Sequence, residues 1–188
     1  MGAPAAAQPA GSQLLREHTG DWLLELDFLV GDWSASGRML SEGGPPSDNP
    51  FTDQLAVRWS PNGEFLISES TSRLLPVEGG SGRILSQRWG YIVYDRAEQR
   101  LLEIAFLSGG TVTTSRIFRL LDAEGRPDQA WQFESTEALN SVVAGQRVRR
   151  TIRRTGPDSF DLEVEVAVAE GDWIRIAEIT YARNRPAE

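Results

Sequence analysis

Charged side chains at alternating positions of expected strands are the residues best suited to chemistry in this sequence. Glu69, Arg116 and Arg150 each share a strand face with apolar neighbours, because successive side chains of a strand point to opposite faces. Those neighbours are Phe65, Ile67, Val112, Phe118, Val148 and Ile152. A charge enclosed among apolar side chains must pair, bind water or contact a ligand. The three residues therefore form either a self-satisfying Glu–Arg pair or a catalytic or binding site for an enolate, a carboxylate or another polar head.

Bulky side chains near these positions are candidates for the walls of an apolar cavity. The candidate ligand-binding residues are Trp59, Trp89, Tyr91, Trp131 and Met39. Aromatic side chains on strands also serve as ordinary core, so both interpretations stay open for them.

Several kinds of chemistry are excluded by composition. The 188 residues contain no Cys, and all nineteen basic residues are Arg, so thiolate catalysis and a Schiff-base lysine are impossible. The single histidine, His18, lies in the N-terminal segment, and a metal site normally needs three or four donors. We expect no cofactor and no metal. A net charge of −8 argues against nucleic acid or an anionic membrane as partner.

The elements that must position these residues are short strands separated by turn signals. The expected strands are 32–40, 51–59, 64–73, 84–95, 100–107, 111–121, 129–137, 145–155, 159–169 and 172–182. Regular spacing with little helix predicts an all-β fold, an antiparallel closed barrel of about ten strands. A short helix is expected over 21–28, either as a plug against one barrel mouth or as a lid over a ligand.

Alternation within the strands predicts which faces are buried. Trp33, Ala35, Gly37 and Met39 share one face, and Phe160 and its alternate neighbours share another. Strands 84–95 and 172–182 are apolar on both faces, so their outer faces could form a homodimer interface. The basic run 147–154 alternates like a strand, and its outward arginines are expected to pair with carboxylates such as Glu163 and Glu165.

The ends of the chain carry no folding signal. Residues 1–20 predict a flexible tail, and 21–184 a single domain. The start lacks the basic and apolar regions of a signal peptide, and no apolar run approaches the ~18 residues of a membrane span, so we expect a cytoplasmic protein.

The segment Phe28-Leu29-Val30-Gly31-Asp32-Trp33, with the Gly-x-Trp on the first strand, resembles the calycin superfamily and its lipocalins. The segment Trp89-Gly90-Tyr91-Ile92-Val93-Tyr94-Asp95 is similar to bacterial lipocalin-like domains of unknown function and, more distantly, to nitrobindin. The resemblance implies a barrel in which an Arg of the last strand, Arg183 or Arg175, packs over Trp33. Nitrobindin binds haem through a His at the far end of its barrel, whereas this chain has no His after His18.

Two functions follow as expectations. The first is binding of a hydrophobic small molecule in the barrel lumen, with the inward Glu and Arg groups orienting its polar end. The second is a cofactor-free cyclase or isomerase of a natural-product pathway, of polyketide type, that uses the same cavity. The absence of His beyond position 18, of Cys and of Lys fits both.

Overall fold

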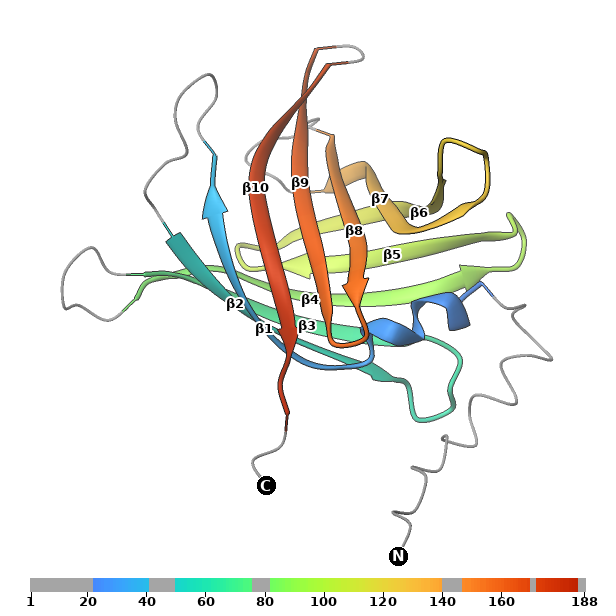
Figure 1. Ribbon diagram of the computed structural model, residues 1–188, viewed down its shortest axis with the longest axis horizontal. Helices are drawn as coiled ribbons and strands as arrows, with labels where there is room; N and C mark the ends of the chain where they lie inside the picture. The colour runs from blue at the N-terminus through green and yellow to red at the C-terminus, as the bar shows by residue number, and fades with distance from the viewer. Residues whose placement is uncertain (1–21, 41–49, 76–81, 140–146, 170–171, 186–188) are drawn as a thin grey trace, which may run out of the picture.

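Ten antiparallel strands form a closed barrel in the computed structural model, which describes residues 22–40, 50–75, 82–139, 147–169 and 172–185 (Figure 1). The strands are β1 Gly31–Met39, β2 Pro50–Trp59, β3 Leu66–Leu74, β4 Ile84–Asp95, β5 Arg100–Leu107, β6 Thr111–Leu121, β7 Pro127–Leu139, β8 Val148–Gly156, β9 Ser159–Ala169 and β10 Asp172–Arg183. Each strand pairs with the next along the chain, and β10 pairs with β1 to close the barrel. The expected fold class is confirmed.

The predicted strand boundaries lie close to the observed ones because the turns carry local signals. Gly109 and Gly110 adopt positive φ angles of 96° and 83° between β5 and β6, where residues with side chains are strained. Asp122 accepts backbone N–H groups of Glu124 and Arg126 in the turn before β7. Because these turn signals are local in the sequence, they mark the ends of the strands independently of the rest of the barrel.

A short 3-10 helix, η1 (Leu24–Leu29), closes one end of the barrel. Leu26 and Leu29 are buried in the core together with Leu23, whereas Trp22 is 57% exposed. This supports the plug interpretation, although the segment is shorter than the expected helix over 21–28 and is of the tighter 3-10 type. No helix in the part of the chain that the structure describes has the length and apolarity to cross a membrane.

Arg183 and Trp33 join η1 to the barrel. The Arg183 guanidinium lies 4.2 Å from the Trp33 ring centroid and donates hydrogen bonds to the carbonyls of Val30 and Phe28. The Trp33 indole donates to the Leu29 carbonyl at 2.8 Å. Carbonyls at a helix end lack partners within the helix, so these donors satisfy them. Arg175 instead pairs with Glu163 and Glu178, so Arg183 holds the position that the resemblance left open.

Gly31 is required at this junction for two reasons. Its φ of +145° is a conformation that residues with side chains rarely adopt. A Cβ atom there would also collide with the Arg183 guanidinium group in its place over Trp33.

Aromatic rings fill the barrel interior next to η1. Phe160 stacks on Tyr181 at 4.5 Å between centroids and meets Trp33 edge-on at 4.8 Å, while Phe28 packs against Trp131 at 4.9 Å. All but Phe28 are at most 5% exposed. The interior beyond this aromatic layer is where charged side chains appear.

In β3 and β6 the side chains that point into the barrel are not the ones that were expected. Leu66 and Ser68 of β3 point inward and are buried, so Glu69 lies exposed on the outer face. In β6, Ser115 and Ile117 point inward and Arg116 is exposed on the outer face. The expectation that Glu69 and Arg116 enter the lumen is therefore wrong. These strands carry apolar residues on both faces, and a shift of one position exchanges the two faces.

Candidate functional site

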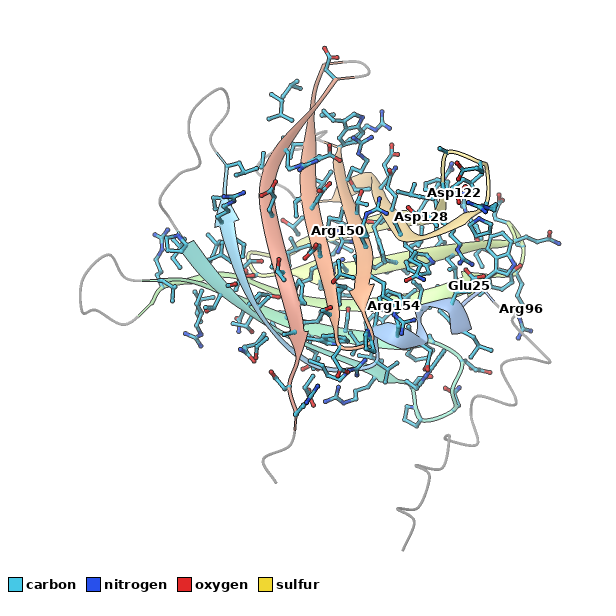
Figure 2. The ribbon with its side chains drawn as sticks, viewed as in Figure 1. Glu25, Arg96, Asp122, Asp128, Arg150 and Arg154 are labelled. Atoms are coloured by element: carbon cyan, nitrogen blue, oxygen red, sulfur yellow. The ribbon has the colours of Figure 1, made fainter. Side chains whose placement is uncertain are left out.

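Three charged side chains meet inside the barrel. Arg88 of β4 and Arg150 of β8 both form ion pairs with the same carboxylate oxygen, Oε2, of Glu103 on β5. The Glu103 side chain is 2% exposed, and those of Arg88 and Arg150 are 20% and 18% exposed. Figure 2 labels Arg150 on β8.

The register of the strands produces this meeting. Gly90 of β4 pairs with Ala105 of β5, which leaves Arg88 and Glu103 pointing inward on neighbouring strands. Arg150 pairs with Phe133 and shares its inward face, and its guanidinium lies 5.0 Å from the Phe133 ring. Because β6 and β7 separate β5 from β8, the Arg150–Glu103 ion pair reaches across the interior.

Burial and charge act in opposite directions on Glu103. Burial alone raises the pKa of a carboxyl group, but the guanidinium groups of Arg150 and Arg88 outweigh it and lower the pKa of Glu103 to about 2. Burial and the neighbouring charge of Arg88 lower the pKa of Arg150 to about 10, against the opposite effect of Glu103. At neutral pH the cluster therefore carries one negative and two positive charges.

A second polar group lies on the other side of the interior. The Tyr181 hydroxyl donates to Asp53 Oδ2 at 2.6 Å, and Ser72 donates to Asp53 Oδ1 at 2.6 Å. Burial raises the pKa of Tyr181 well above its usual 10, and the Asp53 carboxylate raises it further. Tyr181 is thus a hydrogen-bond donor at every ordinary pH.

A cavity of about 60 Å³ lies between these groups. Its lining is mainly apolar, with polar atoms from Ser68, Arg88, Glu103, Arg150 and Tyr181. The Ser68 hydroxyl is buried and has no hydrogen-bond partner. A water needs roughly 10–15 Å³ of such space, so the cavity has room for roughly four waters or for a small polar head group.

Only Arg150, of the three predicted charged site residues, lines this cavity. Glu69 and Arg116 lie on the outer surface, as described above. The outward arginines of β8 behave as expected: Arg149 pairs with Glu165 at 2.7 Å, and Arg153 pairs with Asp128 at 2.6 Å.

The predicted aromatic walls and Met39 also lie outside the cavity lining. Trp89 and Tyr91 are 42% and 38% exposed on the outer face of β4, so they do not line the lumen. Trp131 is buried against Phe28, and the Trp59 indole donates to Asp27 at 2.8 Å. Met39 is partly buried and packs against the core.

Sequence reasoning missed Glu103, Arg88, Asp53 and Tyr181. Asp53 alternates with the apolar residues Phe51 and Leu55 of β2, so its inward position could have been inferred from that alternation. Glu103 likewise alternates with Leu101 and Ala105. Arg88 lies on a strand that is apolar on both faces, and no local signal identified its inward position.

Metal ligands do not gather in this site. Among the described residues, no group of three or more His, Asp or Glu side chains could hold a metal ion. His18 and the expected tail lie outside the described residues.

Comparisons with known proteins bear on the fold. No family model and no curated protein sequence matches this chain. The crystal structure of Rv2717c from M. tuberculosis is similar over 87% of this chain and 97% of its own, with a TM-score of 0.64 and 14% sequence identity. The S-type phycobiliprotein lyase CPES from Guillardia theta is similar over 86% and 92%, with a TM-score of 0.53 and 9% identity. Both likenesses support the fold, a closed antiparallel β-barrel.

Proposed function

We propose that this protein binds an amphipathic small molecule in the barrel lumen, with Arg88, Glu103 and Arg150 orienting its polar end. The observation that carries the proposal is the buried ion cluster beside a cavity into which an unpartnered hydroxyl, that of Ser68, also projects. Replacing a buried ion pair by apolar residues is often neutral or stabilising. A role in ligand recognition accounts for charges that folding alone does not require.

The two walls of the interior suit the two parts of such a ligand. Ser68, Arg88 and Glu103 on β3 to β5 supply the polar wall. Ile152, Phe160 and Leu162 on β8 and β9 supply an apolar wall of the same cavity. A carboxylate or hydroxyl head placed at the arginines leaves the apolar part of the ligand against this apolar wall.

The enzyme alternative, a cofactor-free cyclase or isomerase, is less well supported. Glu69, Arg116 and Arg150 were its proposed catalytic groups, and of these only Arg150 lines the lumen cavity. A carboxylate with a pKa of about 2, such as Glu103, is a weak proton acceptor at neutral pH. Product formation from a candidate polyene is the measurement that would favour this alternative.

The test measures ligand in the purified protein and binding of a defined probe. Mass spectrometry of small molecules extracted from the full chain is expected to show a co-purifying amphipathic compound. Fluorescence titration with cis-parinaric acid, an apolar chain with one carboxylate, tests the site. The cavity of about 60 Å³ has room for the carboxylate head alone, so binding requires the apolar side chains of the lumen to move apart for the chain. Arg150→Met is expected to weaken this binding about tenfold, because it removes a charge-assisted hydrogen-bond donor.

The matched control is Arg153→Met on the same strand. Arg153 faces outward, so this variant removes the same charge without touching the lumen and is expected to bind as wild type. Near-UV circular dichroism shows whether Arg150→Met remains folded, and Ser68→Ala provides a milder second lumen variant. Equal binding by Arg150→Met, Ser68→Ala and wild type, with no co-purifying compound, contradicts the proposal.

A further inference from the structure

A second, larger pocket lies outside the lumen, where η1 meets β6 at the closed end of the barrel. Its volume is about 550 Å³, within the range of small-molecule sites, whereas the lumen cavity is about 60 Å³. Its residues are Trp22, Glu25, Arg100, Arg116, Ile117, Phe118, Arg119, Leu121 and Pro127. Figure 2 labels Glu25 of η1 away from Arg150 of the lumen. We call this space the rim pocket.

The apolar part of the rim pocket faces water. Trp22, Phe118 and Leu121 are 57%, 45% and 62% exposed, and all three line the same space. Large apolar side chains gathered at a concave surface mark binding sites more often than chance exposure does. Two of the three are aromatic, which favours a ligand with a flat ring system.

Positive charge exceeds negative charge in this lining. Arg119 is engaged by Glu25 at 2.7 Å and by the Asp128 carbonyl at 3.1 Å. The Arg100 Nε atom lies 3.7 Å from the nearest Asp95 carboxylate oxygen, which is too far for a hydrogen bond. This Nε atom is buried and has no hydrogen-bond partner. Three arginines against one glutamate make the lining basic within a chain of net charge −8.

Arg116 is the free cation of the rim pocket. Within the described ranges of the chain, no ion pair or hydrogen bond engages its guanidinium group, although it lies among the pocket residues. A guanidinium group offers planar donors that suit a carboxylate or sulfonate and stack on rings. Arg116, which was expected in the lumen, therefore offers free hydrogen-bond donors at this pocket on the outer surface.

We infer that the rim pocket binds an aromatic anion, a flat ring system bearing a carboxylate or sulfonate. The rings lie against Trp22 and Phe118, and Arg116 contacts the anionic group together with Arg100. This site is separate from the lumen site of the proposed function, because the two linings share no residue.

The test compares two fluorescent probes that differ only by a sulfonate group. The first is 8-anilinonaphthalene-1-sulfonate, and the second is N-phenyl-1-naphthylamine, which has the same rings without the sulfonate. Both are titrated into the full chain. The sulfonate is expected to bind about tenfold more tightly than the neutral probe, since hydrogen bonds to charged groups are the stronger ones.

Arg116→Gln is expected to lower the affinity for the sulfonate to that for the neutral probe, and Phe118→Ala to weaken both. The matched charge control is Arg73→Gln, at an exposed position of β3. The lumen variant Ser68→Ala is expected to leave both probes unaffected, while Arg116→Gln leaves cis-parinaric acid binding unaffected.

Four results overturn the inference. The first two are equal affinity of the wild type for the two probes and wild-type sulfonate binding by Arg116→Gln. The other two are loss of sulfonate binding in Ser68→Ala and absence of binding of both probes to the wild type. Failure at the rim pocket leaves the cis-parinaric acid result, and hence the lumen proposal, standing.

Discussion

Glu103 retains its charge at 2% exposure because two guanidinium groups surround it. Neither arginine is its sequence neighbour, and Arg150 lies 47 positions away. Each ion of the cluster depends on the others, since a buried charge without its partner is far more costly than the intact pair. The residue is therefore the most sensitive point of the interior.

Glu103→Gln is expected to lower the free energy of unfolding at pH 7 by about 3–5 kcal/mol, because it leaves two arginines without their counter-charge. Urea denaturation measures this. The control is Glu163→Gln on the outer face of β9. The Glu163 side chain forms an ion pair with Arg175 and is 40% exposed. Its expected cost is below about 1 kcal/mol. Equal costs for the two variants would contradict the assignment of Glu103 as a buried anchor.

The pH dependence of the same residue has a defined sign. The pKa of Glu103 is lowered from 4.5 to about 2 on folding, so the ionised carboxylate stabilises the fold fully above pH 4.5. This stabilisation is lost as the pH falls from 4.5 toward 2. Wild type is therefore expected to lose unfolding free energy more steeply than Glu103→Gln over that interval. Parallel curves for the two proteins are the opposing result.

At the scale of the element, η1 depends on the barrel for its stability. Six residues form too short a helix to persist alone, and no side chain caps its N-terminus. Its stability comes from Leu26 and Leu29 in the core and from Arg183 at its C-terminal carbonyls. The stability of the plug therefore depends on its contacts with the barrel core and with the last strand.

Arg183→Met is expected to destabilise the protein by about 2 kcal/mol, because it removes the cation–π contact with Trp33 and the hydrogen bonds to two carbonyls. Urea denaturation followed by tryptophan fluorescence reports the change. Arg185→Met is the control, since Arg185 is 82% exposed and its ion pair with Asp158 contributes little. A loss no larger than that of the control would show that Arg183 does not hold the plug.

At the scale of the whole molecule, the outer face of β4 and β5 is unusually apolar. Trp89, Tyr91, Ile104 and Phe106 are each 37–43% exposed. The register places Trp89 opposite Phe106 and Tyr91 opposite Ile104, so the four form one continuous patch. The sequence offered strands 84–95 and 172–182 as possible homodimer surfaces. The outer face of β10 carries Glu178 and exposed Thr180, so we keep the homodimer prediction for β4 and its neighbour β5 alone.

The predicted partner of this patch is a second copy of the chain. Light scattering coupled to size exclusion is expected to show a dimer that Tyr91→Arg converts to a monomer, because a buried unpaired charge is costly in an interface. Thr180→Arg on β10 is the control and is expected to remain dimeric. A wild-type protein that is monomeric at high concentration would contradict the prediction of a dimer.

Local sequence patterns predict the strands, the turns and the face of β1 that carries Trp33. These follow from period-two alternation and turn chemistry, which act between residues close along the chain. Phe160 and Leu162 of β9 lie inward as predicted, because the opposite face carries Asp161 and Glu163, whereas Val168 near the end of the strand is 50% exposed. Arg150 was identified for the same reason, from its alternation with Val148 and Ile152.

The inward faces of β3 and β6, and the charges that meet in the lumen, become defined when the barrel closes. Both strands offer apolar side chains to either face, and the closed barrel selects one parity for each through its register with neighbours. That selection moved Glu69 and Arg116 outward. Barrel closure also brings Glu103 and Arg150 together across the lumen. This contact joins strands that are far apart along the chain, so no local sequence pattern predicts it.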